Sequence, residues 1–130
     1  MKKTAIYIVT GFLGSGKTTF IKQVIDSNDN KKKIAVIQNE FAPANFDGKE
    51  LKRLTHKDFD LLEINNGSVF CVCLLSGFLH ALKKLVIQYK PEIILLEASG
   101  LSDTIAIGQI FNSPELQYLL YLAGTIIQHI

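Results

Sequence analysis

Residues 11–18 combine glycines, a lysine and a threonine in a spacing that suits phosphate binding. The segment reads Gly-Phe-Leu-Gly-Ser-Gly-Lys-Thr and fits the pattern G-x-x-x-x-G-K-[ST]. Its glycines allow a tight backbone turn, so that N–H groups converge on phosphate oxygens. Lys17 supplies a positive charge to the outer phosphates, and Thr18 offers a hydroxyl to magnesium. We therefore predict a triphosphate-binding loop made of Gly11, Gly14, Ser15, Gly16, Lys17, Thr18 and Thr19.

The alternative for this loop is a glycine-rich turn that binds no ligand. A chance match of four fixed positions is rare in a chain of 130 residues. The loop also lies between a strand-like run at Ile6–Thr10 and a helix-like run at Lys17–Asp26. That context favours phosphate binding, because a helix that opens at the loop adds the positive end of its dipole.

A carboxylate, Glu97, directly follows the apolar run Ile93–Leu96. In a parallel sheet, ligands bind outside the carboxyl ends of the strands, which is where the phosphate loop also lies. We predict that Glu97 holds magnesium, directly or through water, and orients the attacking water. Gly100 leaves room for the γ-phosphate to approach the backbone. The alternative is that Glu97 only caps the end of a strand.

Two further acidic residues follow the second predicted strand of the chain, Ile34–Ile37. Glu40 stands within Asn39-Glu40-Phe41, and Asp47 follows in a polar loop. This loop either folds over the nucleotide and responds to its γ-phosphate or is simply solvated. Asp47 is the weaker candidate for magnesium, and Glu40 is a candidate for a transition metal.

Cys71 and Cys73 are separated by one residue, which makes a poor structural disulfide. As thiolates they suit zinc, copper(I), cobalt or nickel. Two ligands cannot close a tetrahedral site, so Glu40, His56 or a second subunit would have to add others. The alternative is a pair of reduced cysteines, one of them packed in the core.

Strand-like and helix-like stretches alternate along the chain, which is typical of a parallel sheet covered by helices. Strands are expected at Ile6–Thr10, Ile34–Ile37, Phe59–Ile64, Ile93–Leu96 and from Gly124, and helices at Lys17–Asp26, Leu74–Tyr89 and from Ser113. Residues 39–57 are expected to form a polar loop. The predicted fold class is α/β, a three-layer P-loop NTPase with a mostly parallel sheet that is incomplete at the C-terminus.

Composition indicates a globular domain of ordinary type. Hydrophobic residues make up 48% and charged residues 20% of the chain, and the formal net charge is +2. This charge is too small to indicate binding to nucleic acid or to a membrane. The apolar tail at 118–130 falls short of the roughly 20 residues that cross a bilayer. We expect a cytoplasmic protein, since the cysteines do not indicate an oxidising compartment.

Four motifs occur together in an order that resembles the CobW/HypB/UreG metallochaperone GTPases, and the CobW-like branch most closely. They are Gly11–Thr19, Asn39-Glu40-Phe41, Asn66-Gly67 with nearby cysteines, and Glu97-Ala98-Ser99-Gly100-Leu101-Ser102-Asp103. The resemblance implies Mg-GTP hydrolysis coupled to insertion of zinc or cobalt into a client protein. It also implies a nucleotide-dependent homodimer.

This sequence departs from the family pattern at several positions. The family usually has Cys-x-Cys-Cys after Asn-Gly; aligned in this way, Ser68 and Phe70 replace two cysteines and only Cys71 matches. Ala42 and Thr104 stand where the family has glycine and proline. The family's guanine-reading motif, Asn/Ser-Lys-x-Asp, is absent from these residues, so GTP rather than ATP is implied by the resemblance alone. Residues 1–130 are expected to be the N-terminal portion of a P-loop nucleotide-binding domain.

Two rival functions remain open on sequence. One is a metal-buffering or regulatory module with little NTPase activity. The other is a small-molecule kinase, which would need an arginine-rich lid, whereas Arg53 is the only arginine. For the same reason no arginine finger is evident, and we expect slow intrinsic hydrolysis. The favoured interpretation assigns catalysis to Lys17 and Glu97, with GTP and magnesium as cofactors.

Overall fold

The computed structural model of the chain describes its central sheet and the helices on it. The described residues are 3–11, 23, 26–27, 32–37, 52–55, 57–64, 68–74, 77–98 and 108–128. Among them, no helix is both long enough and apolar enough to cross a membrane.

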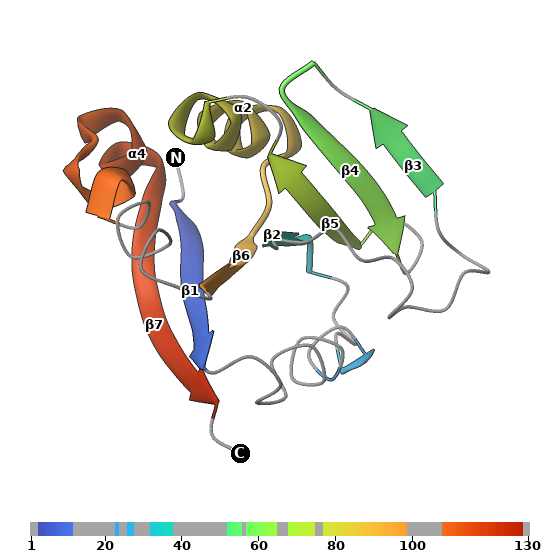
Figure 1. The fold of residues 1–130 in the computed structure, drawn as a ribbon, viewed down its shortest axis with the longest axis horizontal. Helices are drawn as coiled ribbons and strands as arrows, with labels where there is room; N and C mark the ends of the chain where they lie inside the picture. The colour runs from blue at the N-terminus through green and yellow to red at the C-terminus, as the bar shows by residue number, and fades with distance from the viewer. Residues whose placement is uncertain are drawn as a thin grey trace.

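Seven strands of the described chain form one sheet (Figure 1). They are β1 (Thr4–Gly11), β2 (Ile34–Ile37), β3 (Lys52–Thr55), β4 (Phe59–Ile64), β5 (Val69–Leu74), β6 (Ile93–Ala98) and β7 (Leu120–Gln128). Their order across the sheet is β3-β4-β5-β2-β6-β1-β7. Only β4 runs against its neighbours β3 and β5; the other contacts are parallel. The prediction of an α/β fold with a mostly parallel sheet is therefore confirmed.

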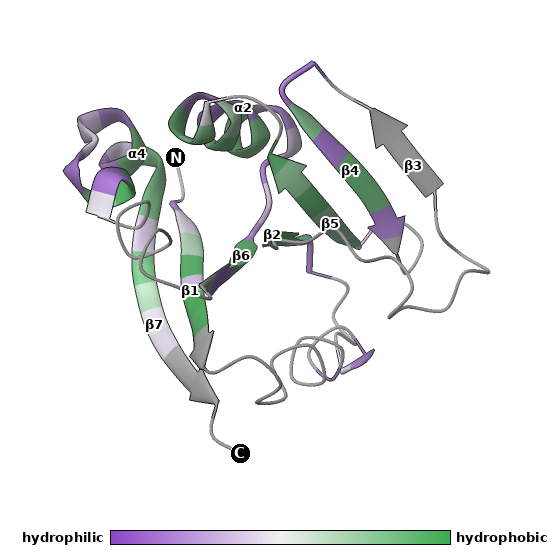
Figure 2. Cartoon of the chain, viewed as in Figure 1, coloured by the Kyte–Doolittle hydropathy of each residue, from purple (hydrophilic) through white to green (hydrophobic). Residues whose placement is uncertain are grey.

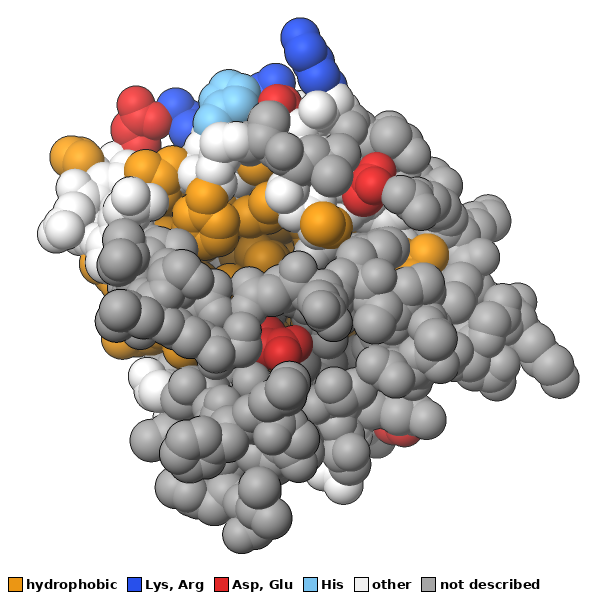
Figure 3. Space-filling model, viewed as in Figure 1, with side chains coloured by type: hydrophobic (Ala, Val, Ile, Leu, Met, Phe, Trp, Pro, Cys, Tyr) orange, Lys and Arg blue, Asp and Glu red, His pale blue; other side chains and the backbone are white. Residues whose placement is uncertain are grey.

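Helix α2 (Phe78–Tyr89) packs on one face of this sheet. Its buried side chains include Leu82 and Leu85, which join a core cluster with Ile6 of β1 and Leu96 of β6. The short helix α4 (Pro114–Leu119) contributes Leu116 to the same cluster. Figure 3 shows hydrophobic side chains gathered in a hollow of this view, with charged side chains along its upper rim.

The opposite face of the sheet is also apolar. A second cluster consists of Ile34, Val36, Leu62, Val69, Cys71 and Leu95, with Tyr7 and Ile93 packed against it. Burial on both faces explains the continuous apolar runs of β2 and β6. In β4, by contrast, hydrophobic and hydrophilic residues alternate along part of the strand (Figure 2).

Several predicted boundaries are confirmed, and three predictions were wrong. β2 and β4 occupy the predicted residues, and α4 begins at Pro114 after Ser113, although the Ser113 side chain makes no capping hydrogen bond. β3 lies inside the predicted polar loop. The helix expected from Leu74 begins at Phe78, because 69–74 form β5 instead. β7 begins at Leu120, four residues before the expected start.

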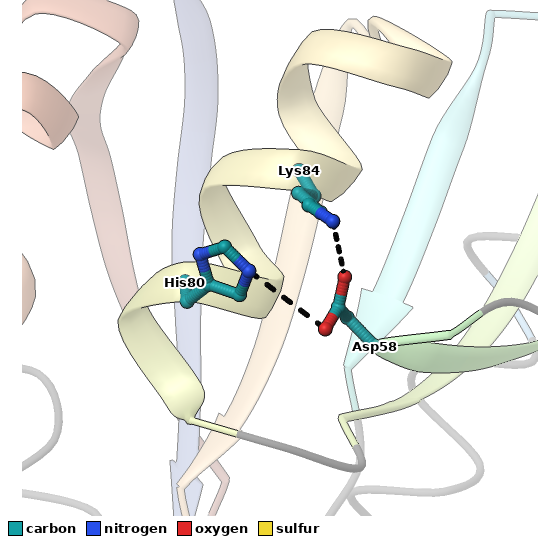
Figure 4. A network of polar contacts seen from close by, with 3 residues as sticks. All are labelled: Asp58, His80 and Lys84. Atoms are coloured by element: carbon teal, nitrogen blue, oxygen red, sulfur yellow. Dashed lines mark ion pairs between the residues drawn. The ribbon is translucent and has the colours of Figure 1, made fainter.

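The helix and the antiparallel part of the sheet are tied by a polar contact (Figure 4). Asp58 precedes β4 and is 7% exposed. Its Oδ2 atom lies 2.7 Å from Nζ of Lys84, and its Oδ1 atom lies 3.8 Å from Nε2 of His80. The adjacent lysine, Lys83, instead pairs with Glu115 of α4 at the surface. Two neighbouring lysines of one helix thus face carboxylates of very different burial.

This difference predicts unequal effects on stability. Lys84→Ala is expected to lower the free energy of unfolding by roughly 1–2 kcal/mol, because it removes the cation beside the buried carboxylate of Asp58. The loss is not larger because the Lys84 side chain is itself partly exposed to solvent. Lys83→Ala, the matched control, is expected to cost less than about 0.5 kcal/mol. Urea denaturation of both variants measures the difference. Equal losses would contradict this account of the Asp58 contact.

Candidate nucleotide and metal site at the carboxyl edge of the sheet

The carboxyl ends of the parallel strands converge on one edge of the sheet. β1 ends there at Gly11, β2 at Ile37 and β6 at Ala98. Gly11, the first glycine of the predicted phosphate loop, is therefore the last residue of a central strand. Ligands of open α/β sheets bind outside this edge, so the fold leads the chain into residues 12–19 at the expected place.

Glu97 lies on the strand next to the one that leads into the phosphate loop. In the parallel ladder of β6 and β1, Glu97 pairs with Val9 and Ala98 with Thr10. Glu97 is half-buried, and its register partner is two residues before Gly11. Neighbouring strands are about 4.8 Å apart. The backbone of Glu97, whose carboxylate is a hard ligand of the kind that magnesium prefers, thus lies one strand away from the start of the predicted loop.

The remaining predicted nucleotide ligands lie outside the described residues. These are Gly14, Ser15, Gly16, Lys17, Thr18, Thr19 and Gly100, together with Asp47 for magnesium and Glu40 for a transition metal. Their roles remain predictions. Among the predicted site residues, the structure places Gly11, Glu97, Cys71 and Cys73.

Cys73 and Glu97 lie at the same level of the sheet. Ile37 of β2 pairs with Val72 of β5 on one side and with Leu96 of β6 on the other. Cys73 and Glu97 each follow these partners by one residue. Because Val72 and Leu96 belong to the core cluster under α2, their successors point to the opposite face. Two strand spacings, roughly 10 Å, separate their backbones.

Asp60 is a candidate ligand that the sequence reasoning missed. It pairs directly with Cys73 in the antiparallel ladder of β4 and β5, and it is 8% exposed. Directly opposed residues have Cβ atoms about 5 Å apart, so one ion can reach both side chains. The alternation in β4 places Asp60 on the face away from α2, but only the pairing register reveals its partner.

The two cysteines differ in environment although they share a face of β5. Cys71 is 2% exposed within the second apolar cluster, whereas Cys73 is partly exposed at the end of the strand. Burial raises the pKa of the Cys71 thiol from 9.0 to about 12. A neutral thiol is a poor metal ligand. Of the two, Cys73 is therefore better placed to bind a metal in this conformation.

The raised pKa of Cys71 predicts a dependence of stability on pH. The folded state retains the thiol proton at pH values where the unfolded state loses it, so this contribution is complete below about pH 9 and is lost as the pH rises toward 12. The free energy of unfolding should fall by about 1 kcal/mol per pH unit across that window through this group. Denaturation at pH 8–11 measures the slope.

Cys71→Ala should flatten this slope, because alanine cannot ionise. If Cys71→Ala retained the parental slope, other titrating groups would account for it, and the buried thiol would not.

The described residues do not by themselves complete a transition-metal site. Within the parts of the chain that the structure describes, no group of three or more His, Cys, Asp or Glu side chains is arranged to hold a metal ion. The pair Asp60 and Cys73 would need at least one further ligand. His80 lies outside this pair, since it is exposed on α2 beside Asp58.

The sequence and the fold both resemble known proteins. Residues 5–128 match the family model for the CobW/HypB/UreG nucleotide-binding domain. A protein named zinc chaperone CobW from Sinorhizobium sp is 32% identical over 123 residues, which cover 92% of this chain and 34% of that protein. The zinc-regulated GTPase metalloprotein activator 1 of Saccharomyces cerevisiae is 33% identical over 130 residues, with coverage of 96% and 30%.

A solved structure shows the same fold. The Zn(II)-bound form of a triple mutant of the YjiA GTPase aligns with a TM-score of 0.72 and 26% sequence identity. The alignment covers 98% of this chain and 41% of that chain. The chain spans about a third of the length of the curated relatives described above.

Proposed function

This chain belongs to the CobW/HypB/UreG family, and we propose on that premise that it binds and hydrolyses GTP as part of a protein that delivers a transition metal, zinc or cobalt. Residues 1–130 are, in this proposal, the N-terminal portion of its P-loop nucleotide-binding domain. The preference for GTP and for zinc is supported by relatives that are named zinc chaperones and zinc-regulated GTPases.

The observation that carries the proposal is the register of β6 against β1. In this register Glu97 of β6 pairs with Val9 of β1, and Val9 is two residues before Gly11. A triphosphate bound by residues 11–19 would therefore lie beside a carboxylate. Both features stand at the edge where α/β sheets bind ligands.

Each residue has a defined task in this proposal. Backbone N–H groups of the loop and the Lys17 ammonium bind the phosphates, and Lys17 balances charge that develops during transfer. The Thr18 hydroxyl and Glu97 hold magnesium, with Asp47 as a weaker candidate. When bound, this ion neutralises phosphate charge and polarises the phosphoryl oxygens. Glu97 also orients the attacking water, and Gly100 leaves space beside the γ-phosphate.

Slow intrinsic hydrolysis is part of this proposal, and the position of β3, the strand that carries Arg53, supports it. It is the only arginine in the sequence and belongs to β3, at the far end of the sheet from β1. Five strand spacings, about 24 Å, separate the two strands. This distance exceeds the length of an arginine side chain, so the proposal assigns Arg53 no role at the phosphate loop of the same chain. A partner that supplies a cation should accelerate turnover.

The transition metal is the cargo in this proposal. Cys73 provides its partly exposed sulfur, and Asp60 provides a carboxylate from the paired position on β4. Glu40 follows β2, which lies between Cys73 and Glu97 in the sheet, and is a candidate for a third ligand. Cys71 could contribute only if the apolar cluster around it opened. A client protein receives the metal, and a nucleotide-dependent homodimer would allow a second subunit to complete the ligand set.

GTP turnover measured with and without zinc tests the proposal. Metal-stimulated release of inorganic phosphate is expected, and Cys73→Ser should reduce the stimulation more than Cys71→Ala. Transfer of the phosphate to a small molecule would identify a kinase instead. Zinc binding with no turnover, at protein concentrations that allow dimers to form, would identify a metal buffer and contradict the GTPase assignment.

A further inference from the structure

A cavity lies at the opposite edge of the sheet, where the parallel strands begin. Its volume is about 490 Å³, and its polar lining consists of Lys3, Thr4, Tyr7, Lys32, Lys90, Glu92 and Tyr121. β1 is eight residues long; it starts at this cavity and ends at the predicted phosphate loop, a distance of roughly 23 Å. The cavity is therefore separate from the candidate nucleotide site.

The charges around the cavity are mainly positive. Lys3, Lys32 and Lys90 line it from three separate segments, and among the lining residues that the structure describes Glu92 is the one acidic residue. Three ammonium groups around one concave space raise the local concentration of anions.

The wall of the cavity is held by buried and backbone hydrogen bonds. The hydroxyl of Thr4 donates to the carbonyl of Pro91 at 2.8 Å, and this contact is buried. The backbone N–H of Glu92 donates to the carbonyl of Lys33 at 2.8 Å, and the N–H of Ala5 donates to the carbonyl of Glu92 at 3.2 Å. These bonds join the backbone segments from which the three lysine side chains project.

Lys90, one of the three lysines of the cavity, has a left-handed backbone conformation. It caps the C-terminus of α2 with φ +48° and ψ +53°, the left-handed conformation that normally favours glycine. Among the described residues it is the only non-glycine residue with positive φ. Residues held in such conformations cluster at functional sites. Lysine here places an ammonium group at the cavity at some cost in backbone strain.

We propose that this cavity binds a small anionic molecule that carries a phosphate group next to a flat ring. The volume lies within the range of about 300–1,000 Å³ that is typical of small-molecule sites. Lysine ammonium groups bind phosphate as point charges. The side chains of Tyr7 and Tyr121 offer aromatic surface for a ring, and Val86, Ile87 and Ile93 add apolar lining.

Pyridoxal 5′-phosphate is a suitable probe, because it combines a phosphate, a flat ring and an aldehyde. The aldehyde condenses with a neighbouring amine with loss of water, and borohydride then reduces the imine to a stable amine. Peptide mass spectrometry identifies each labelled lysine. We expect at least one of Lys3, Lys32 and Lys90 to be labelled about tenfold faster than Lys57, an exposed lysine before β4. Inorganic pyrophosphate should suppress this labelling.

Lys90→Gly is the variant of choice, because glycine relieves the left-handed conformation and should not lower stability. It should reduce labelling of Lys3 and Lys32 severalfold, whereas Lys57→Gly, the matched control, should not. Labelling equal to that of Lys57, or labelling insensitive to pyrophosphate, would overturn the proposal. Stronger protection by hexaglutamate than by pyrophosphate would also overturn it, in favour of an acidic peptide. Because each lysine is mapped separately, the result does not depend on GTP binding at Lys17.

Discussion

Lys17→Ala is expected to weaken binding of Mg-GTP by about tenfold or more. The ammonium group donates charge-assisted hydrogen bonds to phosphate, each worth roughly 1.5–3 kcal/mol, and about 1.4 kcal/mol corresponds to a tenfold change in affinity. The loss should be larger for GTP than for GDP, because in our proposal Lys17 contacts the outer phosphates. Isothermal titration calorimetry measures both affinities.

Lys57→Ala is the matched control for this substitution. Lys57 is exposed before β4, on the side of the sheet remote from β1, so its removal changes the net charge equally without touching the loop. GTP affinity that is the same in Lys17→Ala, Lys57→Ala and the parent would contradict the assignment of residues 11–18 as a phosphate loop.

Glu97→Gln is expected to slow GTP hydrolysis by roughly a hundredfold or more. Glutamine keeps the shape of the side chain but removes the negative charge that we propose to hold magnesium and to orient the attacking water, and such roles contribute factors of about 10²–10⁴. Binding of GTP at saturating magnesium should change much less than the hydrolysis rate. Single-turnover hydrolysis with radiolabelled GTP separates the two effects.

Glu63→Gln provides the control for the loss of a carboxylate from the same sheet. Glu63 lies on β4, opposite Phe70, and is partly exposed. It should hydrolyse GTP at the parental rate. If Glu97→Gln also retained that rate, with an unchanged thermal midpoint, Glu97 would be only a residue at the end of a strand.

The central strands could be predicted from the sequence because their apolar runs are bounded by clear breaks. Ile34–Ile37 and Phe59–Ile64 are strands over the predicted residues, and the glycine at the end of the first strand marks the carboxyl edge. β5 could not be separated from a helix start in this way, since all six of its residues are apolar and short apolar runs carry no clear period. Asn66-Gly67, a strong hairpin signal between two such runs, points to the missed strand.

β3 was missed for a different reason. Lys52–Thr55 has only one strongly hydrophobic residue, Leu54, and it forms a strand through pairing with β4 at the end of the sheet. Tertiary pairing of this kind overrides local propensity. The early start of β7 has a similar cause, because Thr4 of β1 pairs with Leu120.

The candidate site was predictable in its residue types but not in its arrangement. The phosphate-loop pattern and Glu97 follow from their positions after apolar runs. The strand order that brings β6 beside β1, and the register that sets Asp60 opposite Cys73, depend on contacts between segments far apart in the chain. The sequence alone does not distinguish Cys71 from Cys73, whereas in the fold Cys71 is buried and Cys73 is partly exposed.

A crystal structure of the chain with magnesium and a non-hydrolysable GTP analogue would test the central claim most directly. The account predicts phosphates enclosed by the backbone N–H groups and the Lys17 ammonium just beyond Gly11, with Glu97 on the magnesium side. A nucleotide bound at any other edge of the sheet, or a loop whose lysine points away and leaves no space for an anion, would contradict it.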